Sequence, residues 1–308
     1  MKNGLRQFRM TFRRFVEVFR EVLLRGEINQ NSIVIAYYVL FSLFPMIIVF
    51  GNVLPFFRIN TAPLTHYLAM VFPQTIAKFV IPIVNTLLRK HSGGFMSFGI
   101  IFAVWSFSRL TNSIRIAMNR IYGVYAVEKG MPWWNYFLLR SITFLLTTIM
   151  VILFASVIFI LTFGEQILAF LSPIFNLEIT WFDRLQSYRW PIIVGVMIMA
   201  VAYLNYVLPN ISIRKRIVWP GVLVTVVGWL ALSYFFSLYL HYFGTRWENY
   251  GIIGTLIIFM LWLNISSTIF LFGVSINASI DIMKYGGADY TTNWLITFLK
   301  HRRHHLHS

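Results

Sequence analysis

The segment WSFSRLTNSIRIAMNRIY, residues 105–122, places charged and amide side chains in an otherwise apolar stretch. Counted from Phe95, Arg109 lies about 21 Å along a helix, in the last third of a hydrocarbon core about 30 Å thick. Five polar side chains share one broad helical face, the last of them at its edge: Ser108, Arg109, Asn112, Asn119 and Arg115. An arginine at this depth binds an anionic group, such as a lipid phosphate or an acidic solute, or it snorkels to the nearby headgroups. The sequence leaves both roles open.

A proline interrupts another apolar stretch, AYYVLFSLFPMIIVF over residues 36–50. Pro45 lacks an N–H and its ring collides with the carbonyl four residues back, so the Phe41 carbonyl loses its helical partner. In lipid that carbonyl must be met by protein or water, and the Ser42 hydroxyl is close enough to help. We therefore expect a kink whose irregular side faces inward, either as architecture or as part of a substrate pathway.

Three further amides lie in or near later apolar stretches: Asn205, Asn264 and Asn277. Each is more typical of an interhelical hydrogen bond than of a substrate contact. Asn205 and Asn264 nevertheless complete the set of candidate pathway residues, together with Ser42, Pro45 and the polar face around Arg109.

The ionisable residues do not form a catalytic set. The chain has ten Asp and Glu residues, and none lies in a predicted span; Asp281 and Asp289, for example, are expected in cytoplasmic segments. His66, His91 and His241 lack the spacing of metal ligands, there is no cysteine, and neither a P-loop nor a G-x-S-x-G motif is present. We expect no catalytic residue, no metal and no cofactor, so the chain is not predicted to be an enzyme.

Membrane-spanning helices must position these residues. Charged residues make up 12% of the chain, about half the share typical of a soluble domain, and the apolar residues come in blocks long enough to cross a bilayer. The predicted fold is all-α, a polytopic membrane protein with six transmembrane helices. The six spans cover roughly 32–57, 95–116, 141–163, 190–208, 219–243 and 252–276.

The distribution of positive charge sets the orientation of these spans. Of the 26 Lys and Arg residues, 19 fall in the N-terminus, the 108–140 region, the 209–218 loop and the C-terminus, and 7 fall on the opposite side. Positive charge stays inside, so both termini are predicted to be cytoplasmic. The net charge of +16 follows from this topology and from anionic lipid, and nucleic-acid binding is not needed to explain it.

Amphipathic segments accompany the spans. Residues 1–31 are predicted to form a basic amphipathic N-terminal helix in the cytoplasm. Five apolar residues recur there at helical spacing: Phe8, Phe12, Phe15, Phe19 and Val22. Such a helix lies on an anionic membrane surface or packs on the protein's own cytoplasmic loops. Residues 32–280 form the transmembrane domain, with an extracytoplasmic amphipathic insertion over 58–94, and residues 281–308 form a basic cytoplasmic tail.

Several motifs together resemble the YihY/BrkB family of bacterial inner-membrane proteins: AYYVLFSLFP, WSFSRLTNSIRIAMNRIY, YVLPN (206–210), WPG (219–221), YGIIGTL (250–256) and LWLNISSTIFLFGVSINA (261–278). The resemblance covers nearly the whole chain and implies six transmembrane helices with both termini inside. Members have been called ribonuclease BN, which looks like a mislabel because a ribonuclease needs metal ligands or an acid–base pair. Others are linked to serum resistance and envelope biology, and transport of a lipid or small solute is the usual proposal.

The residues and the resemblance together favour an inner-membrane transporter or flippase-like protein for an amphipathic or anionic substrate, a lipid or a small solute, in cell-envelope biology. The expected partners are anionic lipids of the cytoplasmic leaflet, without nucleic acid, and the sequence does not indicate an oligomeric state. The alternative is a non-transporting scaffold or regulator of envelope assembly that docks through its basic N-terminal helix. A membrane-bound ribonuclease is the least favoured function.

Overall fold

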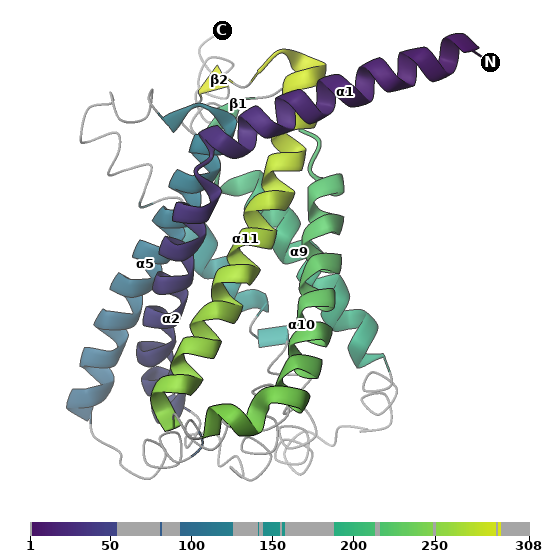
Figure 1. The fold of residues 1–308 in the computed structure, drawn as a ribbon. Coiled ribbons are helices and arrows are strands. Elements are labelled where there is room, and N and C mark those ends of the chain that lie inside the picture. The colour runs from purple at the N-terminus through teal and green to yellow at the C-terminus, as the bar shows by residue number, and fades with distance from the viewer. Residues whose placement is uncertain are drawn as a thin grey trace, which may run out of the picture.

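The computed structural model describes residues 2–53, 81, 93–125, 141, 144–154, 156–157, 188–212, 216–248, 251–287 and 289–290. Helices account for nearly all of them (Figure 1): α1 (Lys2–Arg25), α2 (Ile28–Val53), α5 (Gly93–Tyr122), α9 (Arg189–Val207), α10 (Trp219–Glu248) and α11 (Gly251–Tyr285), with a shorter helical segment over Phe144–Phe154. One short antiparallel pairing joins β1 (Ile211–Ser212) to β2 (Asp289–Tyr290). The predicted all-α class is therefore confirmed, with this small departure.

The helices fall where the hydrophobic blocks place them. Each predicted span coincides with a helix, although the span over 141–163 is described only in part. Three helical stretches among the described residues are long and apolar enough to cross a membrane: Arg189–Val207, Trp219–Tyr242 and Leu256–Tyr285. The predicted insertion over 58–94 lies outside the described residues, apart from Ile81 and the start of α5, and so does the tail beyond Tyr290.

α11 lies at the centre of the bundle. It contacts α1, α2, α5 and α10, while α2 packs on α5 and α9 packs on α10. Figure 1 shows α1 lying across one end of the bundle, where α5, α9 and α11 finish and α10 begins; we call this the α1 end. The buried apolar core is concentrated there, where Ile121, Leu208, Val218 and Leu271 are inaccessible to solvent.

Small residues bring α10 and α11 close together. A Cβ on Gly221 would collide with the Gly273 carbonyl oxygen, and a Cβ on Gly273 would collide with the Thr225 hydroxyl. The Thr225 hydroxyl donates to the Gly221 carbonyl over 2.8 Å. Small residues of this kind let helix backbones approach in membranes, so this contact fixes where α10 meets α11.

A short turn between α1 and α2 sets the direction of α1. At this elbow, Gly26–Glu27, the Asn31 amide donates to the Gly26 carbonyl over 2.7 Å, and Glu27 forms an ion pair with Arg120 of α5. Arg25 donates to the Ile121 carbonyl over 2.7 Å. Contacts from both sides of the turn therefore hold the elbow against the end of α5.

Candidate functional site

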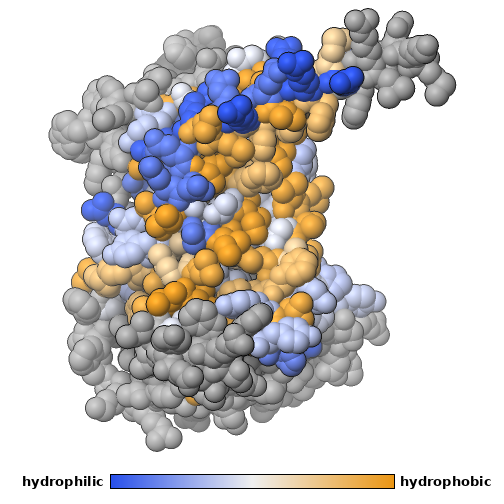
Figure 2. All heavy atoms as spheres, viewed as in Figure 1, coloured by the Kyte–Doolittle hydropathy of each residue, from blue (hydrophilic) through white to orange (hydrophobic). Residues whose placement is uncertain are grey.

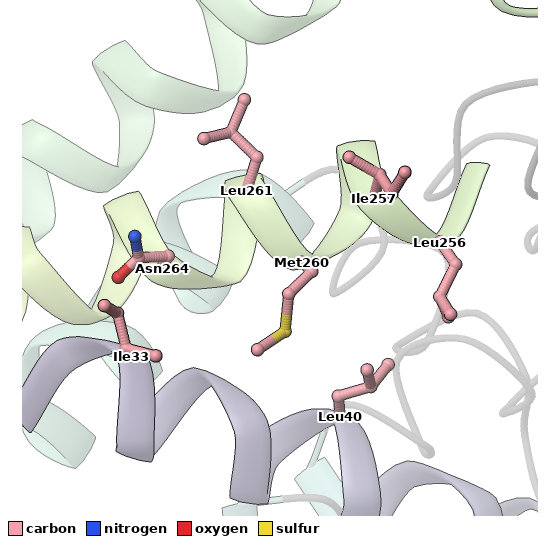
Figure 3. Close-up of a pocket in the computed structure, with 7 residues that line it drawn as sticks. All are labelled: Ile33, Leu40, Leu256, Ile257, Met260, Leu261 and Asn264. Carbon is pink, nitrogen blue, oxygen red and sulfur yellow. The ribbon is translucent and has the colours of Figure 1, made fainter. Parts of the chain in front are cut away.

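A cavity of about 430 Å³ lies between α2 and α11 (Figure 3). Six apolar side chains and one amide line this α2/α11 cavity: Ile33, Leu40, Leu256, Ile257, Met260, Leu261 and Asn264. The two helices run in opposite directions, so Ile33 lies near Asn264 and Leu40 lies near Leu256. The cavity therefore has a polar end and an apolar end, separated by about 12 Å along α11.

The Asn264 carboxamide is the polar feature of this lining. Its Oδ1 atom is buried and has no hydrogen-bond partner in the described part of the chain. A buried acceptor left without a donor costs about 1–3 kcal/mol. An N–H or O–H group of a bound molecule would satisfy Asn264, while the rest of that molecule lies against apolar side chains. The lining therefore fits an amphipathic molecule that carries a hydrogen-bond donor.

Arg109, the main candidate from the sequence, lies elsewhere. Its side chain is exposed, and its guanidinium lies 5.7 Å from the ring centroid of Trp105, which is also exposed. Ser108 is half-buried, and neither it nor Arg109 lines the α2/α11 cavity. An outward-facing arginine beside an aromatic ring fits the predicted snorkelling role more simply than the predicted binding role.

Arg115 is the buried arginine of α5. Only 1% of it is exposed, and its Nη2 donates to the Asn112 Oδ1 over 2.9 Å. Arg109 and Arg115 are six residues apart, which is a rotation of about 240° about the helix axis. The two side chains therefore leave α5 in different directions, and one can face outward while the other faces inward. The polar face predicted for α5 is therefore divided between the outside and the inside of the bundle.

Pro45 and Ser42 are both buried in α2, which is helical on both sides of the proline. The Ser42 hydroxyl donates to the Val39 carbonyl over 2.8 Å. The expectation that it would help the Phe41 carbonyl is wrong, because a serine in a helix reaches the carbonyl of the preceding turn more readily. Neither residue lines the α2/α11 cavity, and their part in a pathway stays a prediction.

Four buried amides form a second polar group at the α1 end, which we call the polar network: Asn119, Asn205, Asn210 and Asn277. The Asn119 Oδ1 accepts from the Asn210 N–H over 2.9 Å. Asn277 accepts from the Gly221 N–H over 2.7 Å and donates to the Asn205 Oδ1 over 3.1 Å. Asn205 and Asn277 thus make the interhelical hydrogen bond expected of them. Within this group, Asn205 and Asn277 join α9, α10 and α11, and Asn119 joins α5 to the turn after α9.

Asp281 is absent from the sequence candidates. It was expected in a cytoplasmic segment, but it is fully buried near the end of α11, and its Oδ1 accepts from the Ile217 N–H over 3.1 Å. The helix can continue past the apolar block because the backbone before α10 supplies this donor. Asn277 and Asp281 are four residues apart and share a helical face, which is the sequence signal that places Asp281 beside the polar network.

Arg216 closes the turn between α9 and α10. Its guanidinium donates to three backbone carbonyls of that turn: Tyr206, Pro209 and Ile211. Burial lowers the pKa of Arg216, and nearby Tyr122 and Asp281 offset part of that change. Burial also raises the pKa of Tyr122, and the charge of Asp281 raises it further, so Tyr122 is a neutral hydroxyl at neutral pH. These groups hold the turn against α5 and α11.

The described residues bring no three His, Asp or Glu side chains together in a way that could hold a metal ion. The amides of the polar network bond to one another and to the backbone, although the Asn210 Nδ2 is buried without a partner among the described residues. Its chemistry is hydrogen bonding between helices. The α2/α11 cavity combines an unpaired acceptor with space beside it, and it is therefore the better candidate for binding a molecule from outside the chain.

Comparison with known proteins defines the family. A family model described as virulence factor BrkB matches residues 19–292. The ribonuclease-like protein YfkH of Bacillus subtilis is 28% identical over 250 residues, which are 81% of this chain and 89% of that protein.

Two longer relatives come from Xanthomonas. UPF0761 membrane proteins of Xanthomonas campestris and Xanthomonas oryzae are each 25% identical over 286 residues, which are 90% of this chain and 61% of each relative. The chain thus spans about three fifths of those relatives, and no solved structure matches it. Because the family match extends over most of the 308 residues, the chain belongs to the BrkB family of membrane proteins.

Proposed function

We propose that the protein crosses the bacterial inner membrane six times and acts there as a transporter or flippase-like protein for an amphipathic substrate of the cell envelope. The crossings correspond to α2, α5, the helix that includes Phe144–Phe154, α9, α10 and α11. The ends of α5, α9 and α11 and the start of α10 share the α1 end (Figure 1), as alternating passes require. The positive-charge bias assigns this end, with both termini, to the cytoplasm.

The α2/α11 cavity is the observation that carries the proposed transport function. Its apolar side chains suit an acyl chain or a similar apolar group, and the Asn264 Oδ1 suits a hydrogen-bond donor. Asn264 lies about 20 Å along α11 from Gly251, which is inside a hydrocarbon core about 30 Å thick. Substrate sites of membrane transporters are typically found at such depths, between helices.

The proposed pathway therefore follows α2 and α11. Asn264 recognises the donor group of the substrate, while Leu40 and Met260 contact its apolar part. Arg109, exposed beside Trp105, serves as an anchor at the headgroups. The buried Arg115, bonded to the half-buried Asn112, helps to position α5 within the bundle.

Lipid translocation in proteoliposomes tests this function. Fluorescent phospholipids that carry a donor group in the headgroup should move between leaflets when the wild-type protein is present. Asn264→Leu removes the acceptor and should slow translocation by at least about tenfold, equivalent to about 1.4 kcal/mol of lost interaction. Leu40→Trp should have a similar effect because it fills the opposite end of the cavity.

Asn264→Gln is the matched control, since it keeps a carboxamide at the same position and should retain part of the activity. The proposed site is wrong if the Asn264→Leu and Leu40→Trp proteins remain folded and translocate lipid at the wild-type rate. The transport function itself is wrong if the wild-type protein translocates neither zwitterionic nor anionic lipids.

The shape of α1 favours a second function, that of a scaffold. Its N-terminal half, residues 2–16, extends beyond the bundle (Figure 1) and exposes Phe12 and Val16. Deleting residues 2–16 would remove this part and leave Phe19 and Val22 packed on the bundle. A scaffold should then lose its effect on the cell envelope, whereas a transporter should keep its rate of translocation in proteoliposomes.

A further inference from the structure

The two halves of α1 meet different surroundings. In the C-terminal half, the Phe19 ring packs edge-on against Phe272 of α11 at 5.1 Å, and Val22 is 1% exposed within the core. The elbow at Gly26–Glu27 fixes this half against α5 through the ion pair of Glu27 with Arg120. The direction of the whole helix is therefore set by its contacts with the bundle.

The N-terminal half carries the same apolar face outward. Phe12 lies three residues before Phe15, and Val16 lies three residues before Phe19 and four after Phe12, which places all of them along one side of the helix. Phe12 is 59% exposed and Val16 is 46% exposed, because this half extends past the edge of the bundle (Figure 1). The apolar face of α1 thus packs on α11 in the C-terminal half. In the N-terminal half the same face meets the medium that surrounds the bundle.

Arginines run beside this face. The exposed members in this half are Arg9, Arg13 and Arg14, and Arg20 continues the row in the C-terminal half. Glu17 pairs with Arg13 over 3.1 Å, so the positive charge of this half exceeds its negative charge. Figure 2 shows hydrophilic side chains in a band along α1, with the apolar surface of the bundle directly below it. The helix therefore lies at the border between the apolar surface of the bundle and its polar end.

We propose that the N-terminal half of α1 is a lipid-binding arm that lies in the headgroup region of the surrounding bilayer, with its apolar face toward the acyl chains and its arginines on anionic lipid headgroups. Amphipathic helices of this composition bury their apolar face about 5–10 Å into the headgroup and acyl boundary. In this protein the bundle sets the depth of α1 in the membrane, because the apolar face of α1 around Phe19 and Val22 packs on the bundle.

The charge and the direction of the face identify this occupant. The apolar face of α1 points toward the membrane-embedded part of the bundle. Where the N-terminal half of α1 extends past the edge of the bundle, this face therefore meets hydrocarbon and not solvent. Basic residues beside such a face attract the anionic lipids of the cytoplasmic leaflet. The arm does not depend on the function proposed for the α2/α11 cavity, because none of its residues lines that cavity.

Because the chain has no cysteine, a single introduced cysteine gives a specific label on α1. An environment-sensitive fluorophore is attached to Phe12→Cys on the apolar face, or to Glu17→Cys on the polar face as the matched control. Each full-length protein is placed in nanodiscs of phosphatidylcholine alone or with about one third phosphatidylglycerol. The measurements are the emission maximum and the quenching by aqueous iodide.

With phosphatidylglycerol, the label at position 12 should shift to shorter wavelength and be shielded from iodide at least about fivefold more than the label at position 17. Raising the salt to about 1 M, where the Debye length is about 3 Å, should reduce this shielding. The triple change Arg9→Gln, Arg13→Gln and Arg14→Gln should reduce it in the same way without unfolding the bundle.

Equal quenching of the labels at positions 12 and 17 in every nanodisc would overturn the proposal that this half of α1 binds lipid. Shielding at position 12 that is independent of phosphatidylglycerol and of the arginines would overturn the binding of anionic headgroups. Shielding that is absent in nanodiscs but present in native membranes would assign this face to a protein partner instead, and would also overturn the proposal.

Discussion

The two halves of α11 have different surroundings. In the C-terminal half, Leu271, Val274, Ala278 and Asp281 are fully buried. In the N-terminal half, Leu256, Ile257 and Leu261 are exposed or line the α2/α11 cavity, and Asn264 has a buried acceptor without a partner among the described residues. One continuous helix thus joins a closely packed region to one that leaves space.

The difference reflects how helices associate in lipid. Apolar side chains lie as favourably against lipid as against another helix, so tight association needs small residues and polar bonds. The C-terminal half has both, in Gly273 and Asn277, whereas the lining of the N-terminal half is apolar apart from Asn264. The C-terminal half can hold the bundle together, while the space beside the N-terminal half is the proposed ligand site.

The largest effect is expected from Gly221→Ala in the closely packed region. The added Cβ would meet the Gly273 carbonyl oxygen, which is backbone and cannot rotate away, and overpacking of this kind costs about 1–3 kcal/mol. We expect about 3 kcal/mol and a clearly lower melting temperature in detergent. The fluorescence of the tryptophans during heating provides the measurement.

Gly195→Ala in α9 is the control for that change. A Cβ at Gly195 has no heavy atom within 4 Å, so the substitution should stabilise the helix by about 0.5–1 kcal/mol. If both alanines shift the melting temperature in the same direction, the close approach of α10 and α11 is not what holds the bundle.

A smaller loss of stability is expected from Asp281→Ala. The change leaves the Ile217 N–H without its acceptor, which costs about 1–3 kcal/mol in a buried site. Asp281→Asn keeps an oxygen acceptor at the same place and should lose less than about 1 kcal/mol. Equal melting temperatures for the two variants would show that the charge of Asp281, and not its hydrogen bond, stabilises the turn before α10.

The sequence predicted the helices well because hydrophobic length is a local property. Each apolar block specifies its own helix, and α9 at Arg189–Val207 lies within a residue of the predicted span over 190–208. The end of α11 is different. It continues to Tyr285, and Asp281 near this end is buried with a donor from a distant residue, Ile217. The spacing of Asn277 and Asp281 indicates that they share a helical face, but no local pattern identifies that donor.

The candidate site was less predictable because it depends on how each helix is rotated against its neighbours. Sequence spacing puts Arg109 and Arg115 near one polar face, but the packing of α5 buries Arg115 and exposes Arg109. For Asn264 the sequence favoured an interhelical hydrogen bond, which no described residue makes to its Oδ1, and its place in a pathway stays a prediction. Its unpaired oxygen follows from the space between α2 and α11, which only the assembled bundle defines.

A gain of stability is expected from Asn264→Leu, in contrast to the losses at the other half of α11. The Asn264 Oδ1 is buried without a partner among the described residues, which costs stability. An apolar side chain of similar size removes this cost and should raise the free energy of unfolding by about 1 kcal/mol. A higher melting temperature combined with loss of translocation would show that Asn264 is needed for translocation although it lowers the stability of the protein. A lower melting temperature would mean that the amide has a structural partner in the membrane.

The smallest effect at neutral pH is expected from Tyr122→Phe, at the edge of the closely packed region. The Tyr122 hydroxyl is buried with no hydrogen-bond partner in the part of the chain that the structure describes. Its removal relieves that cost, as at Asn264, but leaves the space of the oxygen unfilled, so the net change in stability should be less than about 0.5 kcal/mol. The effect should grow at alkaline pH. Burial raises the pKa of Tyr122 above its ordinary value of 10.0, so the folded protein keeps a proton that the unfolded chain releases, and wild-type stability should fall as the pH rises above 10.

By pH 10.5 this loss should reach about 0.8 kcal/mol in the wild type and be absent from the Tyr122→Phe protein. The measurement compares the two melting temperatures between pH 8 and pH 10.5, so that the other tyrosines, common to both proteins, cancel. Parallel curves would show that Tyr122 ionises as easily in the folded protein as in the unfolded chain. Water would then reach the α1 end, and the closely packed half of α11 would be less closed than its contacts indicate.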